Sequence, residues 1–246
     1  MNEEQRITVC KASLSQIHAM LRTAPQNWGN YLALARTISV HLDSTTFMQQ
    51  LNRTQEQTWV ITGLQRLASI EADSGGVPDI AAWCARQWLT IHHRDPDNLA
   101  ALQGLGEIWL MKAQPALVRI HGIDGSSSRT GSSQSQRSSQ SFNSARDNEL
   151  SAQQLAEAER RAATTDYVEA RGHLQPAKDY LERAISSATS KRTLSGDLLA
   201  MTAEAYMSIG NASSPRVNEQ YFRRALQLLR AATEIEGYSL STHLKQ

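Results

Sequence analysis

The sequence predicts an all-α protein of stacked antiparallel helical hairpins, and three observations support this fold class. Alanine and leucine are abundant while phenylalanine is scarce, and no alternating apolar and polar pattern typical of a β-strand persists. Proline, glycine and serine recur at intervals that suit paired helices of about 15–18 residues joined by short turns. A single serine-rich stretch interrupts this organisation. Together these features favour an α-solenoid in which one segment is not folded.

Start and stop signals divide the chain into predicted helices. Pro25 follows the first helix, and Ser74–Pro78 ends the fourth and opens the fifth. Asp95–Asp97 ends the fifth helix and provides a cap for the sixth. Gly210–Asn211 ends the ninth helix, after which Ser213–Pro215 supplies two serine caps and a proline near the first helical position. The predicted helices are 3–23, 28–42, 44–53, 55–72, 78–93, 97–115, 146–169, 172–189, 195–210, 215–234 and 237–246.

Residues 123–145 form the strongest break in composition. Serine, glycine, glutamine and arginine dominate this stretch, and Phe142 is its only large apolar residue near the centre. Such a segment buries too little apolar surface to offset the entropy of ordering, so we expect it to be a disordered loop. It separates N-terminal hairpins in residues 1–122 from C-terminal hairpins in residues 146–246, which we expect to form one continuous solenoid.

Composition excludes several classes of protein. The 246 residues include 25 basic and 24 acidic side chains, and a net charge of +1 argues against a dedicated binder of the phosphate backbone. Cys10 and Cys84 are too few for a disulfide scaffold or a multi-cysteine zinc site. The chain has no apolar run long enough for a membrane span, and its first residues do not resemble a signal peptide. We therefore expect an intracellular protein of the cytoplasm or nucleus.

A degenerate repeat connects the two halves of the chain. The helices after residues 96 and 195 each place a contact residue, a small residue and an aromatic at positions +3, +4 and +7 from a leucine. A small residue lets a partner helix approach closely, and the aromatic fills the groove one turn later. The partner helices carry a second pattern of small, large and small residues. The first pattern is formed by Leu102, Leu105, Gly106 and Trp109, and again by Leu199, Thr202, Ala203 and Tyr206. The second pattern is formed by Ala177, Leu181 and Ala184, and in part by Phe222 and Ala225.

These spacings resemble the tetratricopeptide repeat, with its Trp-Leu-Gly-Tyr first helix and its Ala-Phe-Ala-Pro second helix. Residues Trp83–Trp109 and 197–226 carry the resemblance, whereas 28–72 match weakly because Arg66 stands where an aromatic is expected. The resemblance implies an α-solenoid whose first helices line a concave groove. The third pair departs from the family, because 97–115 and 172–189 are separated by the serine-rich stretch and an extra helix at 150–165.

The resemblance also implies which side chains line the groove. It would be apolar, rich in methionine and slightly acidic, which suits a peptide or helical partner. The alternative is that these side chains pack against an adjacent hairpin. The Lys and Asn pattern that clamps chaperone C-termini is not present at these positions, which disfavours a chaperone cofactor. The implied positions are Gln103, Glu107, Leu110 and Met111 in one repeat, and Ala200, Met201, Glu204, Met207 and Ser208 in the next.

No motif indicates catalysis. The chain lacks the phosphate-binding, zinc-protease, nucleophile-elbow and paired-cysteine signatures. His92 and His93 are adjacent, but neighbouring helical residues point about 100° apart and cannot face one metal ion from a single helix. We therefore predict no catalytic residue, metal or cofactor. Five tryptophans (Trp28, Trp59, Trp83, Trp88 and Trp109) are expected to pack in the core, with one or two exposed as interface anchors.

Three Ser-Gln dipeptides lie within the serine-rich stretch, at Ser133, Ser135 and Ser139. Ser-Gln is similar to the site preferred by DNA-damage checkpoint kinases, and each phosphate would add about −1.5 to −2 charges to a mildly basic segment. These serines are candidate phosphorylation sites. The alternative is chance, because any stretch rich in serine and glutamine yields such pairs.

The sequence thus predicts a non-catalytic scaffold or adaptor that binds protein partners within a larger complex. Nucleic acid is not among the predicted partners, no membrane span is expected, and no small-molecule substrate is evident. Two alternatives remain at this stage. One is a phosphorylation-regulated adaptor of a nuclear complex for chromosome maintenance or DNA damage, and the other is a small all-α enzyme or RNA-associated factor.

Overall fold

A computed structural model describes the backbone of residues 2–130 and 144–244, and the side chains of residues 2–122, 152–242 and 244. These residues form α-helices and short 3-10 turns without any strand, which confirms the all-α prediction for the described part. The helices are α1 (Glu3–Thr23), α2 (Leu32–Asp43), α3 (Thr54–Ala68), α4 (Pro78–Arg94), α5 (Leu99–Thr130), α6 (Ser144–Ala162), α7 (Thr165–Ser190), α8 (Gly196–Asn211) and α9 (Pro215–Thr233). The 3-10 turns are Pro25–Tyr31, Phe47–Gln49, Leu51–Arg53, Ala72–Ser74 and Thr242–Leu244.

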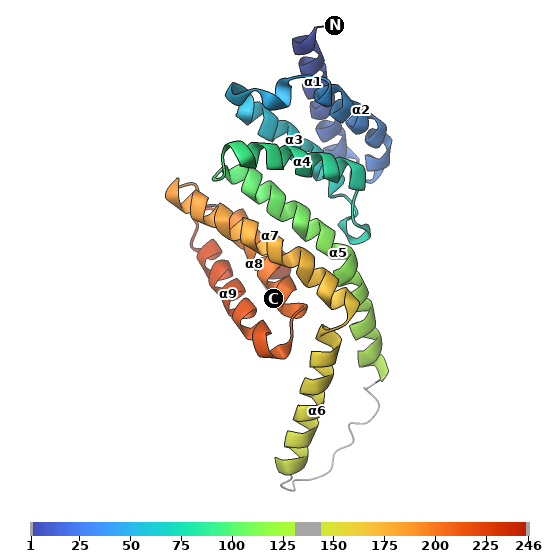
Figure 1. Cartoon of the computed structure of the whole chain (residues 1–246), viewed down its shortest axis with the longest axis vertical. Helices are drawn as coiled ribbons and strands as arrows, with labels where there is room; N and C mark the ends of the chain where they lie inside the picture. The colour runs from blue at the N-terminus through green and yellow to red at the C-terminus, as the bar shows by residue number, and fades with distance from the viewer. Residues whose placement is uncertain (1, 131–143, 245–246) are drawn as a thin grey trace.

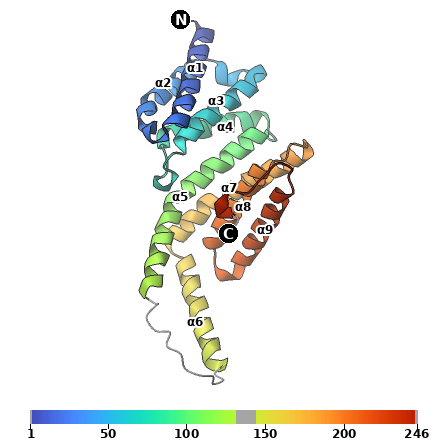
Figure 2. The same ribbon diagram turned by 180° about the vertical axis from the view of Figure 1, so that it is seen from behind.

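The arrangement is helical-repeat-like: α1 to α5 follow one another along the long axis of the molecule, and α7, α8 and α9 lie beside α5 (Figure 1). α1 packs on α2, α3 on α4, α5 on α7 and α8 on α9, and α4 and α7 also contact α5 and α8 respectively. α6 does not join a layer and projects from one end, as both views show (Figures 1 and 2). The extra helix of the sequence analysis is therefore only weakly docked.

Local capping explains several helix boundaries. Asn2 caps α1, because its Oδ1 accepts a hydrogen bond of 2.8 Å from the Gln5 amide while the Gln5 side chain accepts one of 3.0 Å from the Asn2 amide. Ser195 accepts a hydrogen bond from the Leu198 amide at the start of α8. Pro78 and Pro215 open α4 and α9, so the starts predicted at these prolines are confirmed.

Other boundaries differ from the prediction. The helix expected at 44–53 is instead two 3-10 turns, and of the helix expected at 237–246 only the turn Thr242–Leu244 is described. The break expected between residues 169 and 172 lies earlier, at residues 163–164. Part of the stretch 123–145 is helical, because α5 continues to Thr130 and α6 begins at Ser144. The rest of that stretch lies outside the described residues.

Two prolines lie inside helices, and at one of them, Pro115, the helix predicted at 97–115 continues instead of ending. Pro115 lies within α5 and Pro176 within α7, where each removes a backbone hydrogen bond at a cost of about 3 kcal/mol. Both helices continue because they pack against each other over a long contact that buries Leu117 and Leu174. α5 changes direction along its length (Figures 1 and 2), as a proline inside a helix predicts.

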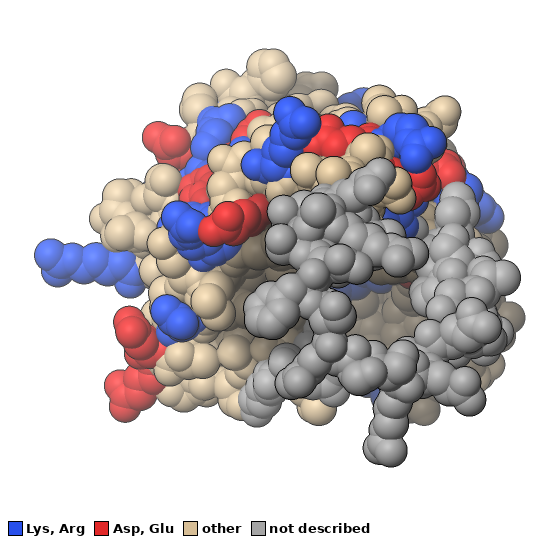
Figure 3. All heavy atoms as spheres, turned by 90° about the horizontal axis from the view of Figure 1, so that it is seen from below, with Lys and Arg blue, Asp and Glu red and all other residues tan. Residues whose placement is uncertain are grey.

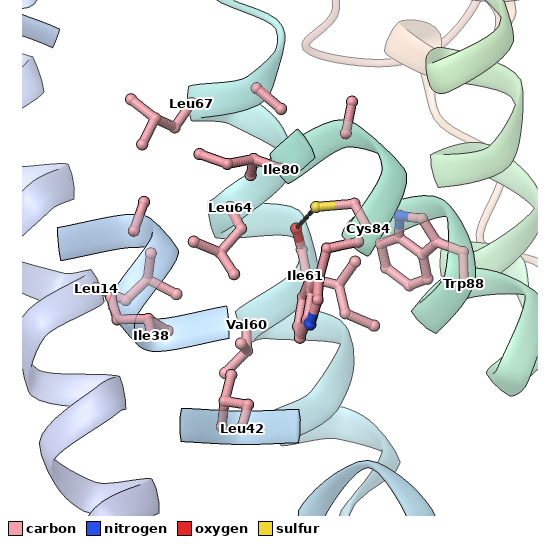
Figure 4. Packing of buried hydrophobic residues seen from close by; sticks show 14 of the residues in the cluster. Leu14, Ile38, Leu42, Val60, Ile61, Leu64, Leu67, Ile80, Cys84 and Trp88 are labelled. Carbon is pink, nitrogen blue, oxygen red and sulfur yellow. Dashed lines mark hydrogen bonds between the residues drawn. The ribbon is translucent and has the colours of Figure 1, made fainter. Parts of the chain in front are cut away.

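The main core lies between α1, α2, α3, α4 and the first part of α5 (Figure 4). Leu14, Leu64 and Trp88 are among its buried side chains. Cys84 is also buried there, with its Sγ 3.8 Å from the Ile61 carbonyl oxygen, and burial raises the pKa of its thiol. Cys84 is thus held as a neutral thiol, and neither it nor Cys10 forms a disulfide.

The small residues of the repeat pattern allow close helix contact. A Cβ atom on Gly106 would lie 2.6 Å from Leu181 of α7, and a Cβ atom on Gly210 would lie 2.8 Å from the Phe222 ring of α9. Real Cβ atoms do not approach other atoms this closely, so the two glycines set the spacing within the pairs α5/α7 and α8/α9. Gly106, Leu181 and Phe222 are all positions that the sequence pattern identified.

An ion-pair cluster at the N-terminal end predicts a pH-dependent stability. Glu56 of α3 accepts hydrogen bonds from Arg53 at 2.8 Å and from Lys11 of α1 at 2.7 Å, and these donors lower its pKa to about 2, from 4.5. A carboxyl whose pKa is lowered by folding stabilises the fold at pH values above its pKa in the unfolded chain. This stabilisation is lost as the pH falls through its pKa in the folded protein. We expect Glu56→Gln to be less stable than the wild type near neutral pH, with a difference that disappears between about pH 4.5 and pH 2. Urea unfolding of both proteins across this range measures it, and a constant difference would contradict the assignment.

Candidate functional site

Two of the predicted groove residues form part of a hydrogen-bonded network. Gln103 Nε2 donates to Glu107 Oε1 at 3.1 Å, and Gln65 Nε2 of α3 donates to Glu107 Oε2 at 2.7 Å. Burial raises the pKa of Glu107, against the opposing effect of these donors. Because both carboxylate oxygens already accept hydrogen bonds within the molecule, Glu107 is not an open negative contact for a partner.

The same network connects three helices through Gln65, which is buried. Trp88 Nε1 of α4 donates to Gln65 Oε1 at 2.6 Å, and Gln65 Nε2 also donates to the Gly104 carbonyl oxygen of α5 at 3.1 Å. The amide of Gln65 therefore satisfies a buried indole N–H, a helix carbonyl and the Glu107 carboxylate at once. Its role is to hold α3, α4 and α5 together.

The remaining groove positions are divided between packing and partial exposure. Met111 is buried in the main core, which corrects its assignment to an open groove. Leu110, Met201 and Met207 are half-buried and pack against the apolar clusters of α5, α7, α8 and α9. Glu204 is half-buried. The pKa of Tyr238 is raised mainly by burial, next by the charge of Asp197 and then by the charge of Glu204. Ala200 is buried and Ser208 half-buried.

An open hollow lies further toward the N-terminus, between α1 and α3. It has a volume of about 440 Å³ and adjoins a second hollow of about 390 Å³ that reaches α5 at Ala100. The Trp59 side chain borders both and is 41% exposed, whereas Trp83 and Trp88 are buried. We call the two together the Trp59 hollow. Its principal lining residues are Ser15, His18, Leu21, Arg22, Trp59, Thr62 and Arg66.

The position of Trp59 is fixed by its neighbours. The His18 ring meets the indole edge-on, with centroids 6.1 Å apart and planes at 71°. His18 Nε2 lies 3.2 Å from the Gly63 carbonyl oxygen, and a Cβ on Gly63 would come within 2.6 Å of the His18 ring. Gly63 thus lets α1 approach α3 closely and holds the histidine against Trp59. The aromatic surface is formed before any ligand arrives, which lowers the entropic cost of binding.

The rim of the Trp59 hollow is basic. Arg22 and Arg66 are exposed, and neither forms an ion pair with a side chain in the described part of the chain. Sequence reasoning treated Arg66 only as a departure from the repeat. The sequence did contain a sign that Trp59 and Arg66 are exposed, because both fall outside the apolar stripe of α3. The buried residues of that stripe include Val60, Ile61 and Leu64.

Charges elsewhere on the molecule are mixed. Viewed from the end where α6 projects, basic and acidic side chains lie side by side along the upper part of the visible face (Figure 3). On α5, Arg119 pairs with Asp166 and Glu169 of α7, both at 2.7 Å. This interspersion on one face agrees with a net charge of +1.

The histidine pair is separated as the sequence analysis expected. His92 is half-buried against the Tyr180 ring and burial lowers its pKa, whereas His93 is exposed with Nδ1 2.8 Å from the Leu89 carbonyl oxygen. Within the described residues, no group of three or more His, Cys, Asp or Glu side chains could hold a metal ion. No helix in that part of the chain is long and apolar enough to cross a membrane. The candidate phosphorylation sites Ser133, Ser135 and Ser139 lie outside the described residues.

Comparison with known proteins does not assign a family. No protein-family model, curated protein or solved structure matches this chain. The contacts described above are therefore the basis for any functional argument.

Proposed function

We propose that this chain is a non-catalytic protein-interaction scaffold with a tetratricopeptide-repeat-like architecture, and that it binds a peptide or helical segment of a partner in the Trp59 hollow. The observation that carries the proposal is a half-exposed indole held by His18 inside a preformed hollow. Tryptophan and arginine are the residues most enriched at the energetic centres of protein interfaces. Arg22 and Arg66 place two such arginines beside Trp59.

The order of helices supports the repeat-like part of the proposal. The Trp59 hollow is lined by α1, α3 and α5, each of which is the first helix of a packed pair. In the tetratricopeptide resemblance, first helices line the groove. The proposed site therefore keeps the predicted face but lies nearer the N-terminus than Gln103, Glu107, Met201 and Glu204. Its rim is basic, where the sequence analysis expected a slightly acidic groove.

The test compares Trp59→Ala with Val40→Ala, a control on α2 whose side chain is 66% exposed and does not line the hollow. Each full-length protein is used to purify partners from a native extract, followed by quantitative mass spectrometry. We expect the wild type and Val40→Ala to retain the same proteins, and Trp59→Ala to retain them at least about tenfold less. Equal retention by all three proteins, each with the helical circular dichroism of the wild type, would exclude the Trp59 hollow as the binding site.

A further inference from the structure

A second hollow lies along the outward face of α4. It has a volume of about 710 Å³ and shares no lining residue with the Trp59 hollow. Ala82, Ala85 and Leu89 form an apolar stripe along its floor, spaced three and four residues apart on one side of the helix. Leu89 is 39% exposed. The two alanines leave room for close approach of another helix, with Leu89 available as an apolar contact.

The charged residues that line this α4 hollow are Arg86, Arg94 and Lys112, all of them basic, and Arg86 forms an ion pair of 2.7 Å with Asp43. Arg94 donates hydrogen bonds to Gln57 Oε1 at 3.1 Å and to the Thr90 carbonyl oxygen at 3.2 Å, and its Nη1 is buried without a partner. Lys112 is exposed and lies 4.5 Å from the centre of the Trp109 ring. Neither side chain forms an ion pair with a carboxylate among the described residues. Both cations therefore have only neutral partners.

The two cations lie toward opposite ends of the stripe. α5 follows α4 after a short turn and packs against it, with Gly104 against Trp88. In two such antiparallel helices, Lys112 comes level with the start of α4 near Ala82, while Arg94 ends α4. From Ala82 to Arg94 the helix rises about 18 Å, or roughly three turns. The apolar stripe itself, from Ala82 to Leu89, rises about 10 Å, or roughly two turns. A stripe of this length between two cations without a carboxylate partner matches one face of a short helix.

We propose that the α4 hollow is a docking surface for an acidic amphipathic helix of a partner protein. Leucine-sized side chains of that helix contact Ala82, Ala85 and Leu89. One flanking carboxylate pairs with the exposed Lys112, and a second lies within the field of the positive charge of Arg94. Charge complementarity selects the occupant, since none of the described residues that line the hollow is a carboxylate that would repel an acidic segment. A nucleic acid fits less well, because the floor is apolar and one of the three lining cations, Arg86, is already paired with Asp43.

The experiment selects ligands from a display library of twenty-residue helical peptides. Apolar positions are fixed at helical spacing, and flanking positions are randomised among Glu, Gln and Lys. We expect the full-length protein to enrich peptides with Glu at the flanks, and a synthesised winner to bind less tightly as salt increases. Leu89→Ser should weaken this peptide about tenfold. Lys112→Glu should weaken it about fivefold or more.

Matched controls separate this surface from the rest of the molecule. Leu51→Ser changes a leucine that is 72% exposed outside the hollow, and Arg66→Glu reverses a charge in the Trp59 hollow; neither should alter binding of the peptide. Enrichment of Lys-rich or Gln-rich peptides, or no enrichment, would overturn the proposal. So would peptide binding that survives both Leu89→Ser and Lys112→Glu, or binding lost in Arg66→Glu. If no peptide binds but single-stranded RNA does, and if both Leu89→Ser and Lys112→Glu weaken the binding of RNA, the surface would be reassigned to nucleic acid.

Discussion

Gly104→Ala is expected to lower the free energy of unfolding by about 2–3 kcal/mol, although alanine is the better helix former. A Cβ atom at this position would lie 2.4 Å from the Trp88 indole. The indole cannot easily move, because it is almost fully buried and its Nε1 donates a hydrogen bond of 2.6 Å to Gln65. Either the ring tilts and that hydrogen bond is lost, or α5 moves away from α4.

Gly122 provides the matched control for this substitution. It lies in the same helix, and a Cβ atom there would meet nothing within 4 Å. Gly122→Ala should therefore raise stability by up to about 1 kcal/mol through reduced backbone entropy of the unfolded chain. Urea unfolding measures both changes, and each kcal/mol should shift the thermal midpoint by about 2–4 °C. A stabilising effect of Gly104→Ala would show that Trp88 does not pack on α5 as described.

Gln65→Met is expected to cost about 3 kcal/mol while keeping the volume of the side chain nearly unchanged. Methionine cannot accept from the Trp88 indole or donate to Glu107, so a buried N–H and a half-buried carboxylate each lose a partner. Gln103→Met is the control, because it removes only one donor to Glu107 at a half-buried position. We expect the control to cost less than about 1 kcal/mol.

Acidification should partly rescue Gln65→Met. Burial in the folded protein raises the pKa of Glu107, so the ionised carboxylate destabilises the fold at neutral pH. This cost is removed as the pH falls from the raised pKa of the folded state toward the unfolded value of 4.5, because the carboxyl becomes protonated. Losing the Gln65 donor raises that pKa further. The deficit of Gln65→Met relative to the wild type should therefore shrink as pH is lowered from 7 toward about 4.5. A deficit independent of pH would mean that Glu107 does not depend on Gln65.

Sequence reasoning located helices best where capping chemistry is local. The starts of α1, α4 and α9 depend on Asn2, Pro78 and Pro215, whose effects are confined to a single turn. It failed at Pro115, where the helix predicted at 97–115 ends, because the local cost of an internal proline is offset by packing between α5 and α7. That contact joins segments far apart in the sequence, so no local pattern reveals it.

The candidate site was predictable only in part. The repeat spacing indicated that first helices line a groove, and it identified Gly106 and Leu181, which pack together. The spacing did not show that Glu107 is occupied by Gln65 of another helix, or that Met111 is buried. It also did not indicate that α4 carries a second hollow, since the partner cation, Lys112, comes from α5.

The pairing of α5 with α7 has a consequence for how the chain can vary. Residues 131–164 separate α5 from α7 in the sequence, yet these two helices make the most extensive helix–helix contact in the described structure. The entropy of closing a loop grows only with the logarithm of its length, so adding residues to a connecting segment is cheap, at about 0.6 kcal/mol for each doubling of a loop. Insertions or deletions there should leave the interface nearly intact. The fold therefore imposes little selection on the length of this connection, and its sequence can diverge while the scaffold is retained.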